Sequence, residues 1–230
     1  MALQAWLRIQ AAVWLPGLAA VAWFDAQHWP WPWVAVALTA MAASFATLVW
    51  VLRARRSVAD IATMVRFLGL LAVVGVGSQR FDVWLWAAAL VVVLLDAVDG
   101  ALARRFGSSE EGAVLDMEAD QMTVLGLAVL VVHSGGAAHV LVLPALRYVF
   151  VLAMWWLGAP AHDPKPVNGD NRRGRRVCAT VLAALLIALW PGIDALARDV
   201  VTAAAVLLLA WSFGDDARFL LTHRRAKARA

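Results

Sequence analysis

The 25 residues from Asp96 to Asp120 read DAVDGALARRFGSSEEGAVLDMEAD, and they lie between two strongly apolar segments. Four aspartates stand in this stretch at spacings of three, seventeen and four: Asp96, Asp99, Asp116 and Asp120. Charged side chains are costly inside a membrane, so their placement here needs an explanation. Residues three or four apart share one face of a helix. The stretch therefore predicts two helices that each present a pair of carboxylates.

The composition of the whole chain is that of an integral membrane protein. Hydrophobic residues make up 63% of the 230 residues, against about half in a typical soluble domain. The net charge is +4 and the isoelectric point is about 10.2. In a membrane protein this excess indicates basic loops near anionic lipid headgroups, so we expect no nucleic-acid partner. The single cysteine, Cys178, excludes an intramolecular disulfide and a CxxC zinc site.

Apolar runs predict eight transmembrane helices in an all-α, polytopic bundle. They cover residues 5–25, 33–52, 65–78, 83–99, 114–133, 139–157, 177–191 and 199–214. The run 65–78 is short, and the preceding segment SVADIATM (57–64) either extends it or lies along the membrane surface. We favour an interfacial amphipathic helix with Ser57 as its N-cap.

Basic residues predict the orientation of this bundle. They gather after the second, fourth and sixth spans and at the end of the chain: Arg53, Arg55, Arg56, Arg104, Arg105, Lys165, Arg172, Arg173, Arg175, Arg176, Arg224, Arg225, Lys227 and Arg229. The alternate loops carry only Arg80 and Arg198. Eight spans with both termini in the cytoplasm fit this asymmetry. A cleaved signal peptide ending near AVA (20–22) is the alternative for the first span, but only Arg8 precedes it.

The aspartates predict a divalent-cation site near the membrane surface. Because the connection from Gly100 to Gly112 is short, the two helices should be antiparallel neighbours, with two carboxylates facing two. Such carboxylates repel one another unless cations lie between them or some are protonated. Oxygen ligands suit Mg²⁺, Mn²⁺ or Ca²⁺, and magnesium keeps positions open for phosphate oxygens. Glycine permits close approach of a ligand, and Arg104 can neutralise phosphate. Any one of these aspartates alone would be an ordinary solvated or capping group.

The pattern Asp-x-x-Asp-Gly-x-x-Ala-Arg, followed by Gly-x-x-x-Asp-x-x-x-Asp, resembles the signature of the CDP-alcohol phosphatidyltransferases. Eight positions carry the resemblance: Asp96, Asp99, Gly100, Ala103, Arg104, Gly112, Asp116 and Asp120. One departure is that seven residues separate Arg104 from Gly112, where the family pattern has eight. The segment ADIATMVR (59–66) is also similar to the family's segment before its first core span. There Asp60 replaces an Asn, while Thr63 and Arg66 match.

This resemblance implies a reaction and a set of roles. The family transfers a phosphatidyl or related phosphoryl group from a CDP-linked donor, here CDP-diacylglycerol, to an alcohol, with release of CMP in phospholipid biosynthesis. By carry-over, Asp96, Asp99 and Asp116 hold Mg²⁺ or Mn²⁺. Asp120 joins a second metal position or is the base that removes the acceptor's proton. The signature residues Gly100, Ala103, Arg104 and Gly112 contact the CDP donor.

The resemblance also implies an architecture. A family core of six helices, with the interfacial helix, covers residues 53–217. A pair of additional transmembrane helices precedes it at 1–52, and a basic cytoplasmic tail follows at 218–230. We further expect a homodimer in a bacterial inner membrane, with the active site facing the cytoplasm.

Several arginines are further candidates for functional residues. Arg147 lies inside the sixth span, where a charge is a functional candidate by default, and its expected partners are the aspartates or a bound phosphate. Four arginines of NRRGRRVCAT are candidates for binding an anionic acceptor or lipid: Arg172, Arg173, Arg175 and Arg176. They also serve as a topology signal. Glu118 falls between Asp116 and Asp120 and is predicted on another face of the helix.

Two other classes of function remain open from the residues. Carboxylates in a membrane protein also mark ion paths, so a divalent-cation transporter is one alternative. A non-catalytic membrane scaffold related to the family is the other. Metal-dependent release of CMP separates the enzyme from both. The acceptor alcohol is not fixed by the sequence.

Overall fold

The computed structural model describes residues 2–26, 32–52, 58–80, 82–106, 110–157 and 172–227. In these residues the chain forms eight α-helices and one short 3-10 helix, with no strand. The helices are α1 (Ala2–Ala26), α2 (Pro32–Leu52), α3 (Val58–Gly77), α4 (Val83–Phe106), α5 (Glu110–His133), η1 (Ala138–Leu141), α6 (Val142–Trp156), α7 (Arg172–Ala188) and α8 (Ala195–Lys227). The all-α prediction is confirmed.

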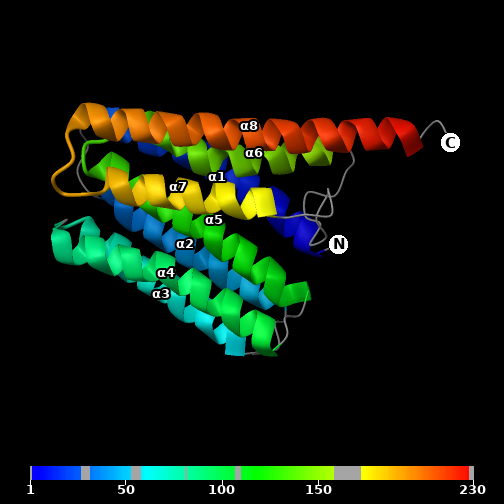
Figure 1. The fold of residues 1–230 in the computed structure, drawn as a ribbon, viewed down its shortest axis with the longest axis horizontal. Helices are drawn as coiled ribbons and strands as arrows, with labels where there is room; N and C mark the ends of the chain where they lie inside the picture. The colour runs from blue at the N-terminus through cyan, green and yellow to red at the C-terminus, as the bar shows by residue number, and fades with distance from the viewer. Residues whose placement is uncertain are drawn as a thin grey trace.

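Successive α-helices run in alternating directions, as Figure 1 shows. The beginning of α1 and the end of α8 therefore lie toward the same end of the bundle. The end of α4 and the beginning of α5 lie at that end too. The described parts of the stretch quoted at the outset thus lie toward that end of the bundle. α3 packs against both α4 and α5, so the direct packing predicted between α4 and α5 is not observed in the described residues.

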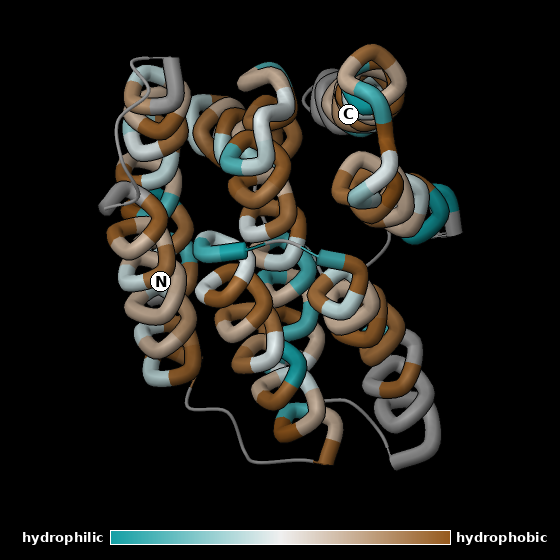
Figure 2. The backbone as a smooth tube through the Cα atoms, turned by 90° about the vertical axis from the view of Figure 1, so that its left-hand side faces the viewer, coloured by the Kyte–Doolittle hydropathy of each residue, from teal (hydrophilic) through white to brown (hydrophobic). Residues whose placement is uncertain are grey.

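Five helices are long and apolar enough to cross a membrane among the residues described: Leu3–Phe24, Val34–Leu52, Val58–Gly77, Ala138–Trp156 and Ala195–Arg218. Figure 2 shows apolar residues along much of the helical bundle. Large tryptophans are exposed close to helix ends, as at Trp50, Trp84 and Trp156. Such amphipathic rings suit the boundary between lipid and water. These features are those of an integral membrane protein.

The segment before the third span is part of that span. Residues 58–64 form the first two turns of α3, which continues to Gly77 without a break. The separate interfacial helix predicted there is therefore not observed. Instead, the segment extends the third apolar helix, which was the alternative interpretation. No Gly or Pro interrupts this stretch, and one of its faces, including Asp60 and Thr63, is buried. Ser57, its predicted N-cap, lies outside the described residues.

Three helices are longer than their apolar runs. α4 continues past residue 99 to Phe106, and α5 begins at Glu110, so the described residues of the predicted 100–112 connection are helical. Ala, Leu and Arg are good helix formers, and they fill residues 101–105. α8 likewise continues to Lys227 through most of the predicted tail. The basic end of the chain is thus a helical extension of the last span.

Local signals set several helix ends. The carboxylate of Asp82 accepts hydrogen bonds from the backbone N–H groups of Trp84 and Leu85, at 3.1 and 3.0 Å, which caps α4. At the end of α5, Gly135 adopts a left-handed backbone with φ of 82°. The N–H of Gly136 then reaches the carbonyl of Val131 at 2.9 Å, which closes the helix.

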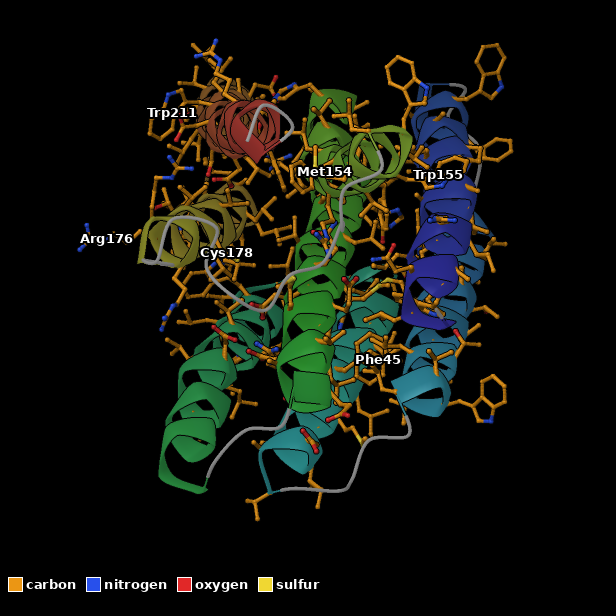
Figure 3. All side chains as sticks on the ribbon, turned by 90° about the vertical axis from the view of Figure 1, so that its right-hand side faces the viewer. Phe45, Met154, Trp155, Arg176, Cys178 and Trp211 are labelled. Carbon is orange, nitrogen blue, oxygen red and sulfur yellow. The ribbon has the colours of Figure 1, made fainter. Side chains whose placement is uncertain are left out.

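The N-terminal pair packs against the core helices. α1 lies against α6, and α2 lies against α3 and α5. The rings of Phe45 in α2 and Phe67 in α3 stack with centroids 3.9 Å apart. The guanidinium of Arg8 lies over the ring of Trp155, which Figure 3 shows beside α1. The pair is therefore an integral part of the bundle.

α5 is the most enclosed helix, and this fixes where the aspartates stand. It packs against α2, α3, α6 and α7. Every residue from 122 to 132 is buried. Asp116 and Asp120 precede this stretch, so they lie on the first turns of a helix held rigidly on several sides.

Candidate functional site

Three of the four signature aspartates meet at one point. Asp96 comes from α4, and Asp116 and Asp120 come from consecutive turns of α5. One carboxylate oxygen from each lies within 4.8 Å of the others. α3 packs against both α4 and α5, and so holds the two helices at the distance that brings these carboxylates together. All three side chains are half-buried, with between 26% and 43% of their surface exposed.

The guanidinium of Arg66, from α3, lies among these carboxylates. Its Nη1 donates to Asp96 Oδ1 and, at 2.9 Å, to Asp120 Oδ1. Its Nη2 donates to Asp116 Oδ1 at 3.1 Å. The side chain is only 2% exposed, so it approaches the aspartates from the interior of the bundle. One cation thus ties three helices together through three carboxylates.

The donor set fits a divalent metal ion of the magnesium type. It consists of carboxylate oxygens alone, which hard cations prefer, and no thiolate or imidazole belongs to the described cluster. When all three carboxylates are ionised, the Arg66 guanidinium leaves two negative charges, which one divalent ion would balance. The partial exposure of the aspartates leaves their outer side open to a ligand.

Other signature residues are placed only through their backbone. Asp99, Gly100, Ala103 and Arg104 belong to α4, but their side chains lie outside the described residues. Asp99 is one helical turn beyond Asp96 on the same helix. Gly112 is half-buried in the first turn of α5, one turn before Asp116. Their predicted roles toward the metal and the donor stay predictions.

Arg147 is paired with a residue that is not part of the cluster. Its Nη2 lies 2.7 Å from Glu118 Oε1, and both side chains are buried. Glu118 is on the face of α5 opposite to Asp116 and Asp120, as its position in the helix predicts. The expectation that Arg147 pairs with the aspartates is therefore corrected: Arg147 forms an ion pair with Glu118. Sequence reasoning had given Glu118 no partner.

The basic segment at the start of α7 divides into two groups. Arg173 donates to the carboxylates of Asp215 and, at 2.5 Å, Asp216 on α8, and lies over the ring of Trp211. The hydrogen bond to Asp215 is the largest cause of a raised pKa for Arg173. Arg175 and Arg176 are exposed, and Figure 3 shows Arg176 projecting outward from α7. The side chain of Arg172 lies outside the described residues.

The residue at the centre of the site, Arg66, was not assigned a role from the sequence. Its signal was present, because it is an arginine within an apolar segment, eight residues after the start of α3 at Val58. An ionisable residue inside a span is a functional candidate by default. The same rule was applied to Arg147. The third span, however, was predicted to begin at residue 65, which placed Arg66 at the end of a span, where a charge needs no functional explanation.

The chain was also compared with known proteins. A family model described as CDP-alcohol phosphatidyltransferase matches residues 56–213. No curated protein and no solved structure matches the chain. The matched residues take in α3 to α7 and most of the apolar part of α8, and they include Arg66 and all the signature aspartates.

Proposed function

Because the chain belongs to the CDP-alcohol phosphatidyltransferase family, we propose that it transfers a phosphatidyl group from CDP-diacylglycerol to an alcohol and releases CMP. The observation that carries the proposal is the convergence of Asp96, Asp116 and Asp120 within 4.8 Å inside the matched region. Divalent-metal dependence is general in this family, and this cluster has the chemistry to meet it. The apolar exterior of the bundle suits a donor whose acyl chains stay in lipid.

The proposed metal ligands are Asp96, Asp99 and Asp116, with Mg²⁺ or Mn²⁺ as the ion. When bound, the metal supplies positive charge that offsets the diphosphate and favours departure of CMP. Gly100 and Gly112 allow the donor to approach the helix backbones closely, and Ala103 keeps the adjoining face of α4 small. Arg104 contributes a further positive charge near the phosphates. Positioning and electrostatics supply much of the rate in phosphoryl transfer.

Asp120 is proposed as the base. The acceptor oxygen bonds to the phosphorus that carries the lipid, and the bond from this phosphorus to the bridging oxygen of the diphosphate breaks. CMP leaves with that electron pair, and the acceptor's proton passes to the carboxylate of Asp120. With 26% of its side chain exposed, Asp120 can be reached by a hydroxyl group directly or through one water.

Exposed arginines suggest where an anionic acceptor or lipid headgroup binds. Arg175 and Arg176 are exposed on the first turns of α7. We propose that they attract such a group, together with Arg172, whereas Arg173 is engaged by α8. The site then faces the cytoplasm of a bacterial cell, with both termini on the same side, as the positive residues predict. A homodimer stays a prediction from the family.

The test is a reconstituted assay of CMP release. Purified protein in lipid nanodiscs with CDP-diacylglycerol is given a panel of acceptor alcohols, both phosphorylated and neutral. We expect release of CMP with at least one acceptor, its loss on chelation and its return with Mg²⁺ or Mn²⁺. Glu111→Gln, which changes an exposed acid on α5, is the matched control and should behave as wild type. Full activity in chelator would exclude the metal assignment, and cation uptake without CMP release would favour a transporter.

A further inference from the structure

Arg66 differs from its partners in exposure and in direction of approach. Its side chain is 2% exposed, while those of Asp96, Asp116 and Asp120 are 38%, 43% and 26% exposed. The guanidinium therefore contacts the carboxylates from the buried side of the cluster. A cation that enters from water meets the same carboxylates from the other side.

A buried guanidinium of this kind is retained only when anions compensate it. Taking a charge out of water is unfavourable unless oppositely charged partners are well placed. Here three carboxylates are placed to accept hydrogen bonds from the guanidinium. Arg66 and the aspartates thus form one electrostatic unit that joins α3 to α4 and α5. The unit holds the carboxylates close together in spite of their mutual repulsion.

The oxygens that accept hydrogen bonds from Arg66 belong to two carboxylates proposed to hold the metal, Asp96 and Asp116, and to the proposed base, Asp120. Nη1 is shared by Asp96 and Asp120, and Nη2 is directed at Asp116. A divalent ion with ligands from Asp96 and Asp116 would stand within a few ångströms of the guanidinium. Two like charges at such a separation oppose each other, more strongly away from bulk water. Metal and guanidinium therefore compete for the same negative charge.

We propose that Arg66 is an internal counter-ion that competes with the metal for Asp96 and Asp116, and that turns to the diphosphate of the donor once the metal is bound. This inference rests on the proposed function and deepens it. A guanidinium is planar, permanently charged and has several N–H donors, which suit phosphate oxygens as well as carboxylates. Arg66 consequently weakens binding of the metal alone and strengthens binding of a diphosphate to the loaded site.

The proposal predicts opposite changes in two affinities when the charge is removed. In Arg66→Gln, the affinity for Mn²⁺ alone should rise on the order of tenfold or more, because a positive charge has left the ligand set. The affinity for cytidine diphosphate, measured with Mn²⁺ saturating, should fall by a similar factor. Mn²⁺ is followed by electron paramagnetic resonance of the free ion, and cytidine diphosphate by equilibrium dialysis, both with protein in nanodiscs.

Two further variants complete the experiment. Arg66→Lys keeps the charge on a single nitrogen, which cannot bridge three carboxylates as the guanidinium does. It should bind Mn²⁺ several-fold more tightly than wild type, with a smaller change than Arg66→Gln. Arg80→Gln removes an exposed arginine after α3 and is the matched control, with both affinities unchanged. If Arg66→Gln fails to fold, the two affinities of Arg66→Lys test the proposal.

The outcomes separate this inference from the proposed function. Weaker binding of both Mn²⁺ and cytidine diphosphate in the Arg66 variants would make Arg66 purely structural and overturn the inference. Unchanged Mn²⁺ affinity, or unchanged diphosphate affinity, would overturn it too. None of these results bears on whether wild-type protein releases CMP. Conversely, absence of CMP release alongside the predicted opposite shifts would leave the inference standing and reject the proposed reaction.

Discussion

Arg147 of α6 donates to Glu118 of α5 across 2.7 Å, and this ion pair is buried on the side of α5 that faces away from the aspartates. The pair holds α6 to α5 by a charge-assisted hydrogen bond between buried side chains. Met117 Sδ lies 3.7 Å from the same nitrogen, Arg147 Nη2. This geometry indicates that Arg147 contributes to the stability of the bundle, and its role toward an acceptor stays a prediction.

The first prediction concerns this pair. Glu118→Leu leaves Arg147 as a buried charge without its acid, so the free energy of unfolding should fall by about 3–5 kcal/mol. The double variant Glu118→Leu with Arg147→Leu removes both charges and should recover most of this loss. Denaturant unfolding in detergent micelles measures both. Equal stability of the single variant and wild type would contradict the structural role. A raised acceptor KM in the stable double variant would restore Arg147 as an acceptor ligand.

The second prediction concerns the proposed metal ligands. Asp96→Asn and Asp116→Asn keep the size of the side chain but remove its charge. Affinity for CDP-diacylglycerol in the presence of Mg²⁺, and turnover, should both decrease, because the metal that binds the diphosphate loses a ligand. Glu111→Gln is again the control. Donor affinity at the wild-type level in both variants would remove these two residues from the metal site.

The third prediction separates Asp120 from the other aspartates. As a base, Asp120 affects proton transfer, so Asp120→Asn should lower turnover about 10²-fold or more and leave donor affinity largely intact. Donor affinity is measured with Mg²⁺ or Mn²⁺ present, alongside turnover of CMP. A loss of donor affinity equal to that of Asp96→Asn would instead identify Asp120 as a shared metal ligand.

The fourth prediction concerns the contact of α5 with α2 and α3. A Cβ at Gly126 would lie 3.0 Å from Val74 Cγ2 and 3.2 Å from Met41 Cε. Gly126→Ala should therefore lower the unfolding temperature slightly, as flexible side chains give way. Gly126→Leu should lower it strongly, because overpacking of a close helix contact forces the helices apart. In Gly214→Ala, the control, a Cβ meets nothing within 4 Å, and stability should be maintained or increased. Similar stability of Gly126→Leu and wild type would contradict the packing.

Much of the fold followed from hydrophobic runs and helical spacing. The eight described α-helices coincide in position with the eight predicted apolar runs, and five of them are long and apolar enough to cross a membrane. The spacing of Asp116 and Asp120 correctly placed both on one face. Spacing defines a face of a helix but not the neighbour that this face meets. For this reason the partners of Asp120 and Glu118, which are Arg66 and Arg147, were not predicted. Helix ends were also missed where good helix formers continue beyond the apolar residues, as at Phe106 and Lys227.

The acidic residues on opposite faces of α5 have a consequence for the insertion of the chain into the membrane. α5 carries acids on opposite faces of its first turns, and it is not among the five helices apolar enough to cross a membrane by their own composition. Its aspartates are compensated by Arg66, which is synthesised earlier, and Glu118 by Arg147, which is synthesised later. A nascent chain that stops after α5 therefore lacks Arg147, the positive charge that compensates Glu118. We therefore expect α5 to insert stably only once α6 has been made, with these helices entering the lipid bilayer as a group.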